Sequence, residues 1–156
     1  MKDIYTITAK YTRQNADGSM KRVSESYMTS GVNFTDAESK MHSHIPNTDL
    51  VITSIKRENT IHDVILNDTD AKYFKLVLVY NSVDNKAVRL TYIVEAADID
   101  TASEILSKDW ENSGIKFEIN SISATNITEV FNFEATEKVE QEMVDEDDQD
   151  AFEYEK

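Results

Sequence analysis

Apolar residues recur at every second position near the start of the chain, which is the period of a half-buried β-strand. The apolar positions are Tyr5, Ile7, Ala9 and Tyr11, followed by Val23 and Tyr27. Asp17-Gly18 lies between these two runs, and this dipeptide is typical of a hairpin turn. The pattern therefore predicts two antiparallel strands joined by a turn.

A helix and a third strand are predicted next. The apolar positions now recur every four residues, at Ala37, Met41 and Ile45. Thr35 and Glu38 have the spacing of a capping box, in which side chains bond the free N–H groups at a helix start. Pro46, the only proline, indicates where the helix ends, and residues 50–55 have the composition of a strand.

The same order of patterns returns in the second half of the chain. Two strand-like runs consist of Phe74, Leu76, Leu78 and Tyr80, then Val88, Leu90, Tyr92 and Val94. A helical face follows at Ala102, Leu106 and Trp110. Asp100 or Thr101 is the expected cap of this helix, and Phe117 and Ile119 belong to its closing strand. Each half therefore predicts a β-β-α-β unit.

Identical residues at matched positions indicate that this unit is duplicated. Ile52, Ser54, Ile55 and Asn59 are repeated 67 positions later as Ile119, Ser121, Ile122 and Asn126. We therefore expect an α+β fold in which a tandem duplication of a β-β-α-β unit, about six strands and two helices, forms one pseudo-symmetric domain. Units of this size fold poorly alone, so one shared core is expected. Its expected members are Tyr11, Tyr27, Met41, Ile55, Leu78, Tyr92, Leu106, Trp110 and Ile122.

The predicted boundaries are residues 1–66 for the first repeat, 67–133 for the second and 134–156 for an acidic tail. A further matched segment follows each third strand, at residues 61–65 and 127–131. Its composition fits either a short fourth strand or a helical turn.

The net charge of −14 is unevenly spread along the chain. Residues 1–59 hold eight Lys and Arg against seven Asp and Glu, whereas residues 134–156 hold two against eleven, a net of −9. So polar a tail is expected to be disordered. It carries candidate partner-binding residues near its tip, which are Asp147, Asp148, Asp150, Phe152 and Tyr154. The alternative is a tail that only solubilises the protein.

Several sequence blocks resemble a known family. The blocks are VSESYMTSGVNFTDAE, TSIKREN, KYFKLVLVYN, VEAADIDTA and ISATNITEVF. Their order and spacing over about residues 4–131 are similar to a domain-of-unknown-function family of Bacteroides-type gut bacteria and their tailed phages. The resemblance implies an intracellular protein of bacterial or phage origin, and it carries no catalytic residues to transfer.

Enzymatic chemistry finds little support in the sequence, and we expect a protein that is not an enzyme. His42 and His44 are two positions apart on the predicted helix, so they point to different sides and cannot bind one metal ion together. The three glycines form no phosphate-binding loop, and the chain has no cysteine. No catalytic residue, metal site or cofactor is therefore predicted. No signal peptide or membrane-spanning run is found, which predicts a cytoplasmic protein without a membrane partner.

Basic residues of the first repeat are the candidate nucleic-acid-binding set, namely Lys10, Arg13, Lys21, Arg22, Lys56 and Arg57. Tyr5, Tyr11 and Tyr27 lie among them, and cations with interleaved aromatic rings are typical of surfaces that hold single-stranded nucleic acid. The alternative is that the rings belong to the core and the cations are merely solvated.

These observations favour a non-enzymatic protein that binds single-stranded nucleic acid, DNA or RNA, or a replication complex, with the tail docking on a protein partner. One alternative is a protein–protein adaptor or host-modulating phage protein. The other is an acidic mimic of DNA.

Overall fold

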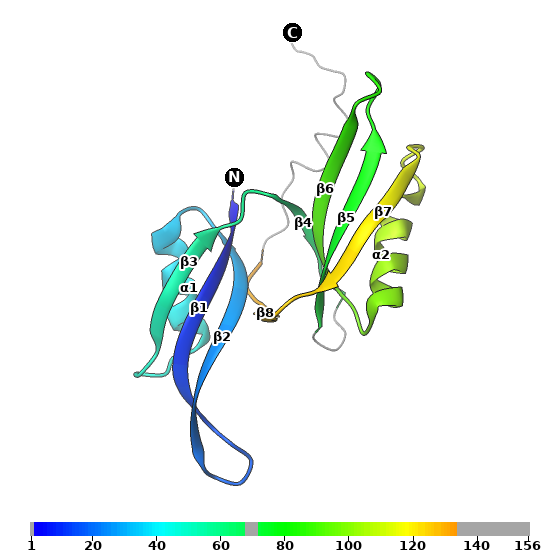
Figure 1. Cartoon of the computed structure of the whole chain (residues 1–156). Coiled ribbons are helices and arrows are strands. Elements are labelled where there is room, and N and C mark those ends of the chain that lie inside the picture. Colours follow the sequence, from blue (N-terminus) through cyan, green and yellow to red (C-terminus); the bar gives the residue numbers. More distant parts are fainter. Residues whose placement is uncertain (1, 68–71, 134–156) are drawn as a thin grey trace.

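The computed structural model describes residues 2–67 and 72–133. The described residues form eight strands and two helices in an α+β fold, whose arrangement is shown in Figure 1. The elements in chain order are β1 (Asp3–Gln14), β2 (Met20–Gly31), α1 (Phe34–His44), β3 (Val51–Arg57), β4 (Ile61–Ile65), β5 (Tyr73–Asn81), β6 (Ala87–Glu95), α2 (Ile99–Glu111), β7 (Phe117–Ala124) and β8 (Ile127–Val130). Each half of the chain thus has the order β-β-α-β-β.

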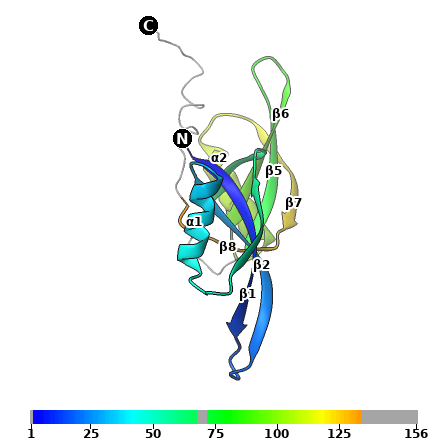
Figure 2. The same cartoon turned by 90° about the vertical axis from the view of Figure 1, so that its left-hand side faces the viewer.

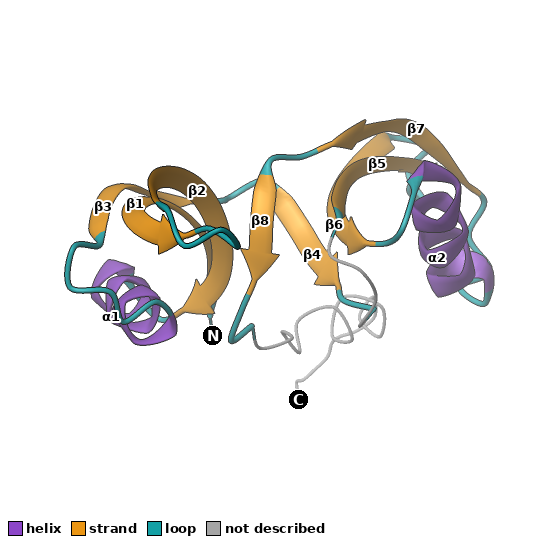
Figure 3. Ribbon diagram, turned by 90° about the horizontal axis from the view of Figure 1, so that it is seen from below, coloured by secondary structure: helices purple, strands orange, loops and turns teal. Residues whose placement is uncertain are grey.

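The strands form two four-stranded sheets, with strand orders β3-β1-β2-β8 and β4-β6-β5-β7. We call them the first and second sheet. The fourth strand of each half belongs to the sheet of the other half: β8 pairs parallel with β2, and β4 pairs parallel with β6. The chain crosses between the sheets at residues 58–60 and returns at residues 125–126. Both exchanged strands lie in the middle of the molecule (Figure 3).

The segments at 61–65 and 127–131, which fit a strand or a helical turn from sequence, are strands. Eight strands therefore replace the expected six or so. The exchange also means that a division of the chain between residues 66 and 67 does not separate the two sheets. The third strand begins and ends slightly later than expected, at Val51 and Arg57.

Each helix covers one face of its own sheet. α1 packs on β1, β2 and β3, whereas α2 packs on β5, β6 and β7. Figure 2 shows α1 lying along the first sheet. Neither described helix is both long enough and apolar enough to cross a lipid bilayer.

The helix caps predicted from sequence are wrong. Asn33 caps α1, and its side chain accepts a hydrogen bond from the Asp36 amide. Asp98 caps α2 and accepts one from the Thr101 amide. Both helices begin earlier than the apolar period predicts. Their first residues, Phe34 and Ile99, are exposed, so they do not belong to the four-residue period of buried positions.

The apolar interior has three parts. The first lies between α1 and the first sheet, and includes Tyr5, Ile7, Tyr27 and Met41. The second lies between α2 and the second sheet, and includes Leu76, Leu78, Tyr92 and Leu106. The third lies between the sheets, on their faces away from the helices, and consists of Ile4, Met28, Val64, Tyr73, Ile93 and Val130.

Six of the expected core residues are buried, and Ile55, Trp110 and Ile122 are partly buried against the same clusters. The expectation of one shared core is wrong, because the buried residues form three separate clusters. The halves instead keep separate helix–sheet cores and join through the third cluster and the exchanged strands. Val64 and Val130 place both of those strands in that cluster.

Candidate nucleic-acid interface

Three of the six candidate cations lie on the face of the first sheet that α1 does not cover. Side chains alternate between the two faces of a strand, and the buried Ile7 and Tyr27 face α1. Lys10, Arg22 and Lys56 lie opposite Ser24, Thr12 and Thr6 in the strand register, so their side chains project from the other face. All three are exposed. We call this surface the uncovered face.

Hydroxyl side chains surround these cations on the uncovered face. In β1 and β2 they are Thr6, Thr8, Thr12, Ser24 and Ser26, and Ser54 adds another from β3. Hydroxyl groups and cations both bind phosphate oxygens. Two exposed apolar side chains, Met20 and Val51, lie on the same face, and the Thr6 hydroxyl donates a hydrogen bond to Glu58 at 2.7 Å. The uncovered face thus combines cations and hydroxyl groups with two exposed apolar side chains and one carboxylate.

The other three candidates lie on the side of α1, at its margins. Arg13 and Lys21 are register partners near the tip of the β1–β2 hairpin, and Arg57 pairs with Tyr5 in the register. The guanidinium of Arg57 lies over the Phe34 ring, 5.2 Å from its centroid. The six cations thus do not form one strip, because the strand period of two divides them between opposite faces.

Ion pairs further distinguish the arginines from the lysines. Arg13 pairs with Glu25 at 2.9 Å, Arg22 with Asp49 at 3.2 Å and Arg57 with Asp3 at 3.5 Å. Hydrogen bonding by Thr12 lowers the pKa of Asp49, and the charge of Arg22 adds to this effect. Arg22 is therefore partly neutralised, whereas Lys10 and Lys56 extend into solvent from the same face.

The three tyrosines among the basic residues belong to the core, which confirms the alternative interpretation for the rings. That the cations are merely solvated stays a prediction. Tyr5 is fully buried, and Tyr11 and Tyr27 are 8% and 3% exposed. The hydroxyls of Tyr11 and Tyr27 donate to Glu25 at 2.7 and 2.6 Å. Their rings are packed against α1, so they are not available to stack on bases.

The second sheet adds two cations that sequence reasoning missed. Lys75 and Arg89 lie opposite Ile93 and Val79, on the face that α2 does not cover, and both are exposed. The alternation of side chains along the strand indicates the position of Lys75. Because Phe74 and Leu76 face α2, Lys75 between them faces away from the helix. Glu118 opposes Val79 on the same face and offsets part of this charge.

The surface that α2 presents on the second half is acidic. The charged residues at α2 are Asp98, Asp100, Glu104, Asp109 and Glu111 against Lys108. Within the second half, Lys75 and Arg89 thus lie on the sheet face, and the acidic excess lies on the helix side.

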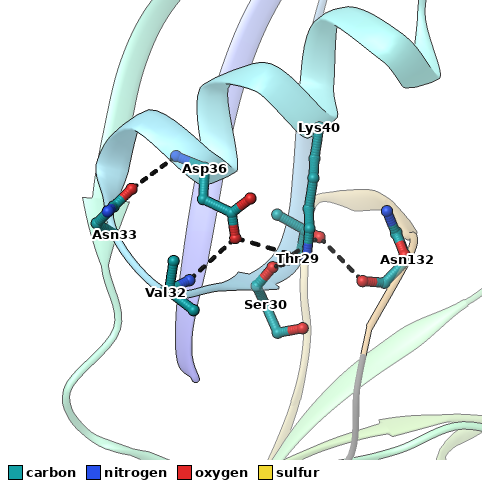
Figure 4. Close-up of polar contacts among 7 residues, drawn as sticks. All are labelled: Thr29, Ser30, Val32, Asn33, Asp36, Lys40 and Asn132. Atoms are coloured by element: carbon teal, nitrogen blue, oxygen red, sulfur yellow. Dashed lines mark hydrogen bonds and ion pairs between the residues drawn. The ribbon is translucent and has the colours of Figure 1, made fainter. Parts of the chain in front are cut away.

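A second polar cluster surrounds the start of α1 (Figure 4) and is closed on itself. Asp36 accepts a hydrogen bond from the Val32 amide at 3.0 Å. Lys40 lies 3.9 Å from Asp36 and donates to the carbonyl of Ser30 at 2.7 Å. The buried Thr29 donates to the carbonyl of Asn132 at 3.4 Å. Since each of these groups has its partner, the cluster joins α1, β2 and the residues after β8 rather than forming a reactive site.

The histidines do not form a metal site in the described part of the chain, where no three His, Asp or Glu side chains are grouped to hold an ion. His42 and His44 are both exposed. His44 also contacts Glu129 at 2.8 Å and stacks on Phe131 at 4.1 Å between centroids. His62 contacts the Tyr92 ring edge-on. Glu129 lies 85 residues from His44 in sequence, so no local pattern reveals this contact.

The proposed partner-binding residues of the tail, Asp147, Asp148, Asp150, Phe152 and Tyr154, lie outside the described residues.

A comparison of the chain with curated proteins finds no match. A family described as a domain of unknown function, DUF4494, matches residues 3–133, which include every described helix and strand. The chain therefore belongs to the DUF4494 family.

Proposed function

We propose that this protein is a non-enzymatic binding protein that holds single-stranded nucleic acid on the uncovered face of its first sheet. The observation that carries the proposal is the placement of Lys10, Arg22 and Lys56 together on one sheet face, among Ser and Thr hydroxyls. Lys75 and Arg89 extend the same charge onto the second sheet. Cations and hydroxyls bind phosphate oxygens without reading the bases.

The contacts proposed here are to the sugar–phosphate backbone. With Tyr5, Tyr11 and Tyr27 buried, the first sheet offers no ring from this set for stacking. Base stacking supplies about 1–3 kcal/mol per base in proteins that use it, so binding without it is expected to be weak and strongly salt-dependent. We propose a strand with flexible backbone rather than a duplex, because it can follow a curved sheet face.

The tail is proposed to regulate this binding through its charge. The whole chain carries −14 and residues 134–156 carry −9, which leaves −5 for residues 1–133. A segment of that charge competes with phosphate for the same cations and can dock on a basic protein partner. We propose a replication complex as this partner, in the cytoplasm of a Bacteroides-type bacterium or its phage.

We also propose that the body arose by tandem duplication. The six residues of the third cluster fall into three matched pairs, which are Ile4 with Tyr73, Met28 with Ile93, and Val64 with Val130. The exchanged strands share the order Ile, any residue, acid, Val, apolar residue. Equal strand order and equal roles in packing are what a duplicated unit would leave.

The test compares two triple variants that remove the same charge from opposite faces. In Lys10→Gln, Arg22→Gln, Lys56→Gln we expect oligonucleotide binding to be lost. In the matched control Arg13→Gln, Lys21→Gln, Arg57→Gln we expect binding to persist. Fluorescence anisotropy of a labelled single strand is the measurement, with circular dichroism to verify the fold. Equal losses in both variants would show that only net charge matters and would refute the assigned face.

The acidic surface at α2 favours one alternative, a protein–protein adaptor that binds a basic partner. Five acids against one lysine lie at this helix. The two proposals differ in a simple measurement, because an adaptor or a mimic of DNA binds no oligonucleotide even at low salt. Reversal of Asp100, Glu104 and Asp109 to Lys would abolish the adaptor function and leave nucleic-acid binding intact.

A further inference from the structure

The short strand β8 pairs with β2 of the first sheet, and its Val130 amide also donates a hydrogen bond to the Tyr73 hydroxyl of the second sheet at 3.3 Å. Ser26, Tyr27 and Met28 of β2 are its register partners, and the Phe131 amide donates to the Met28 carbonyl at 3.0 Å. The edge of β2 is therefore a site that binds an extended segment by parallel strand addition.

Side-chain contacts make this edge specific for the segment that follows Asn126. Val130 is buried in the third cluster, while Phe131 is buried in the first core on the opposite side. Glu129 meets His44 at 2.8 Å, and the His44 ring stacks on Phe131. The site thus recognises an acidic residue, a Val and an aromatic residue in consecutive positions.

The connection that supplies this strand in the same chain is very short. β7 ends at Ala124, which pairs with Phe74 in the second sheet, and β8 begins at Ile127, which pairs with Ser26 in the first. Only Thr125 and Asn126 join them. A short connection of this kind is a hinge at which an element can be exchanged between identical chains, because the exchanged contacts are the same as the internal ones.

We propose that the edge of β2 is a strand-docking site that accepts the segment 127–131 of a second copy of this chain as well as its own. Two copies then pair by exchanging β8, and each first core is completed by the Phe131 of the partner. At low concentration the chain's own strand occupies the site, because a two-residue connection gives an effective concentration of roughly millimolar order. The proposal is independent of nucleic-acid binding.

The experiment shortens or lengthens the hinge in the full chain. Deletion of Thr125 and Asn126 places Ala124 next to Ile127, and consecutive Cα atoms are only about 3.8 Å apart, so one chain cannot serve both sheets. We expect this variant to be a dimer by light scattering during size-exclusion chromatography. Insertion of two glycines between Thr125 and Asn126 is the matched control and should remain a monomer. A folded, monomeric deletion variant would overturn the proposal.

A second measurement decides the matter if the deletion variant does not fold. A protease site placed between Thr125 and Asn126 allows the folded full chain to be cut. We expect the cut chain, but not the uncut one, to take up a labelled peptide of residues 126–133. The same peptide with Val130→Asp should not bind, because an acid would then enter the third cluster. No uptake by the cut chain would refute the docking site.

Discussion

Tyr5 carries a buried hydroxyl that the packing of this position does not require. Its oxygen is the one buried side-chain polar atom, among the described residues, without a hydrogen-bond partner. The matched position in the second half is Phe74, which is buried in the same manner against α2. The hydroxyl at Tyr5 therefore costs stability, since a buried polar group without a partner loses its hydration.

Replacement of Tyr5 by Phe is expected to stabilise the protein by about 1 kcal/mol, because it removes this unpaired group and keeps the ring. Urea unfolding followed by Trp110 fluorescence gives the free energy of unfolding. Tyr27→Phe is the matched control and should destabilise, since the Tyr27 hydroxyl donates to Glu25 at 2.6 Å. Equal destabilisation in both variants would contradict the prediction.

Glu25 is a partly buried carboxyl of the first half whose ionisation stabilises the fold. Burial raises its pKa, but hydrogen bonds from Tyr27 and Tyr11 and the charge of Arg13 outweigh burial and hold the pKa below the ordinary value of 4.5. Its folded pKa is thus lower than its unfolded pKa. The stabilisation is present above the unfolded value and is lost as the pH falls through the folded value.

We therefore expect the free energy of unfolding to fall on acidification below about pH 4.5, more steeply in the wild type than in Glu25→Gln. Other carboxyls with lowered pKa values, such as Asp49 and Asp98, titrate in both proteins and cancel in the comparison. Parallel pH profiles for the two proteins would show that Glu25 contributes nothing.

At the scale of elements, the helix caps test the corrected start of each helix. Asn33→Ala and Asp98→Ala should each destabilise by about 1 kcal/mol, because each leaves an N–H group of the first turn without its acceptor. Thr35→Ala, at the position that the sequence suggested for a cap, should change stability very little. A larger loss for Thr35→Ala than for Asn33→Ala would reverse this assignment.

The apolar period was sufficient to predict most elements but not their ends. The strands of both hairpins and the faces of both helices are fixed by buried residues such as Tyr27, Met41 and Leu106, which the alternation identifies. The helix caps are exposed polar side chains, and the period of apolar residues does not predict where these lie. The six candidate cations are close along the chain, but the alternation of strand side chains assigns them to two opposite faces.

At the scale of the whole molecule, the exchange of β4 and β8 was beyond the reach of local patterns. The matched segments were visible, but which sheet receives a strand depends on contacts such as Val130 with Tyr73 and His44 with Glu129. These contacts join residues more than 50 positions apart, and nothing in either segment alone specifies them.

Two truncations test the role of β8 in the body. A chain that ends after Phe133 should keep its thermal stability, since it retains every described strand. A chain that ends after Asn126 should lose its cooperative transition, because the first core loses Phe131 and the third cluster loses Val130. Differential scanning calorimetry distinguishes them, and equal transitions would contradict a structural role for β8.

The measurement that tests the proposed function most directly is a salt titration of single-stranded oligonucleotide binding to the full chain and to the chain ending after Phe133. We expect the truncated chain to bind more tightly, and the difference to shrink as salt rises, because tail and phosphate compete for the same cations. Three phosphate contacts predict a slope of roughly −2 in log K against log salt for the truncated chain. If neither form binds at about 50 mM salt, where phosphate contacts are strong, the nucleic-acid proposal is refuted.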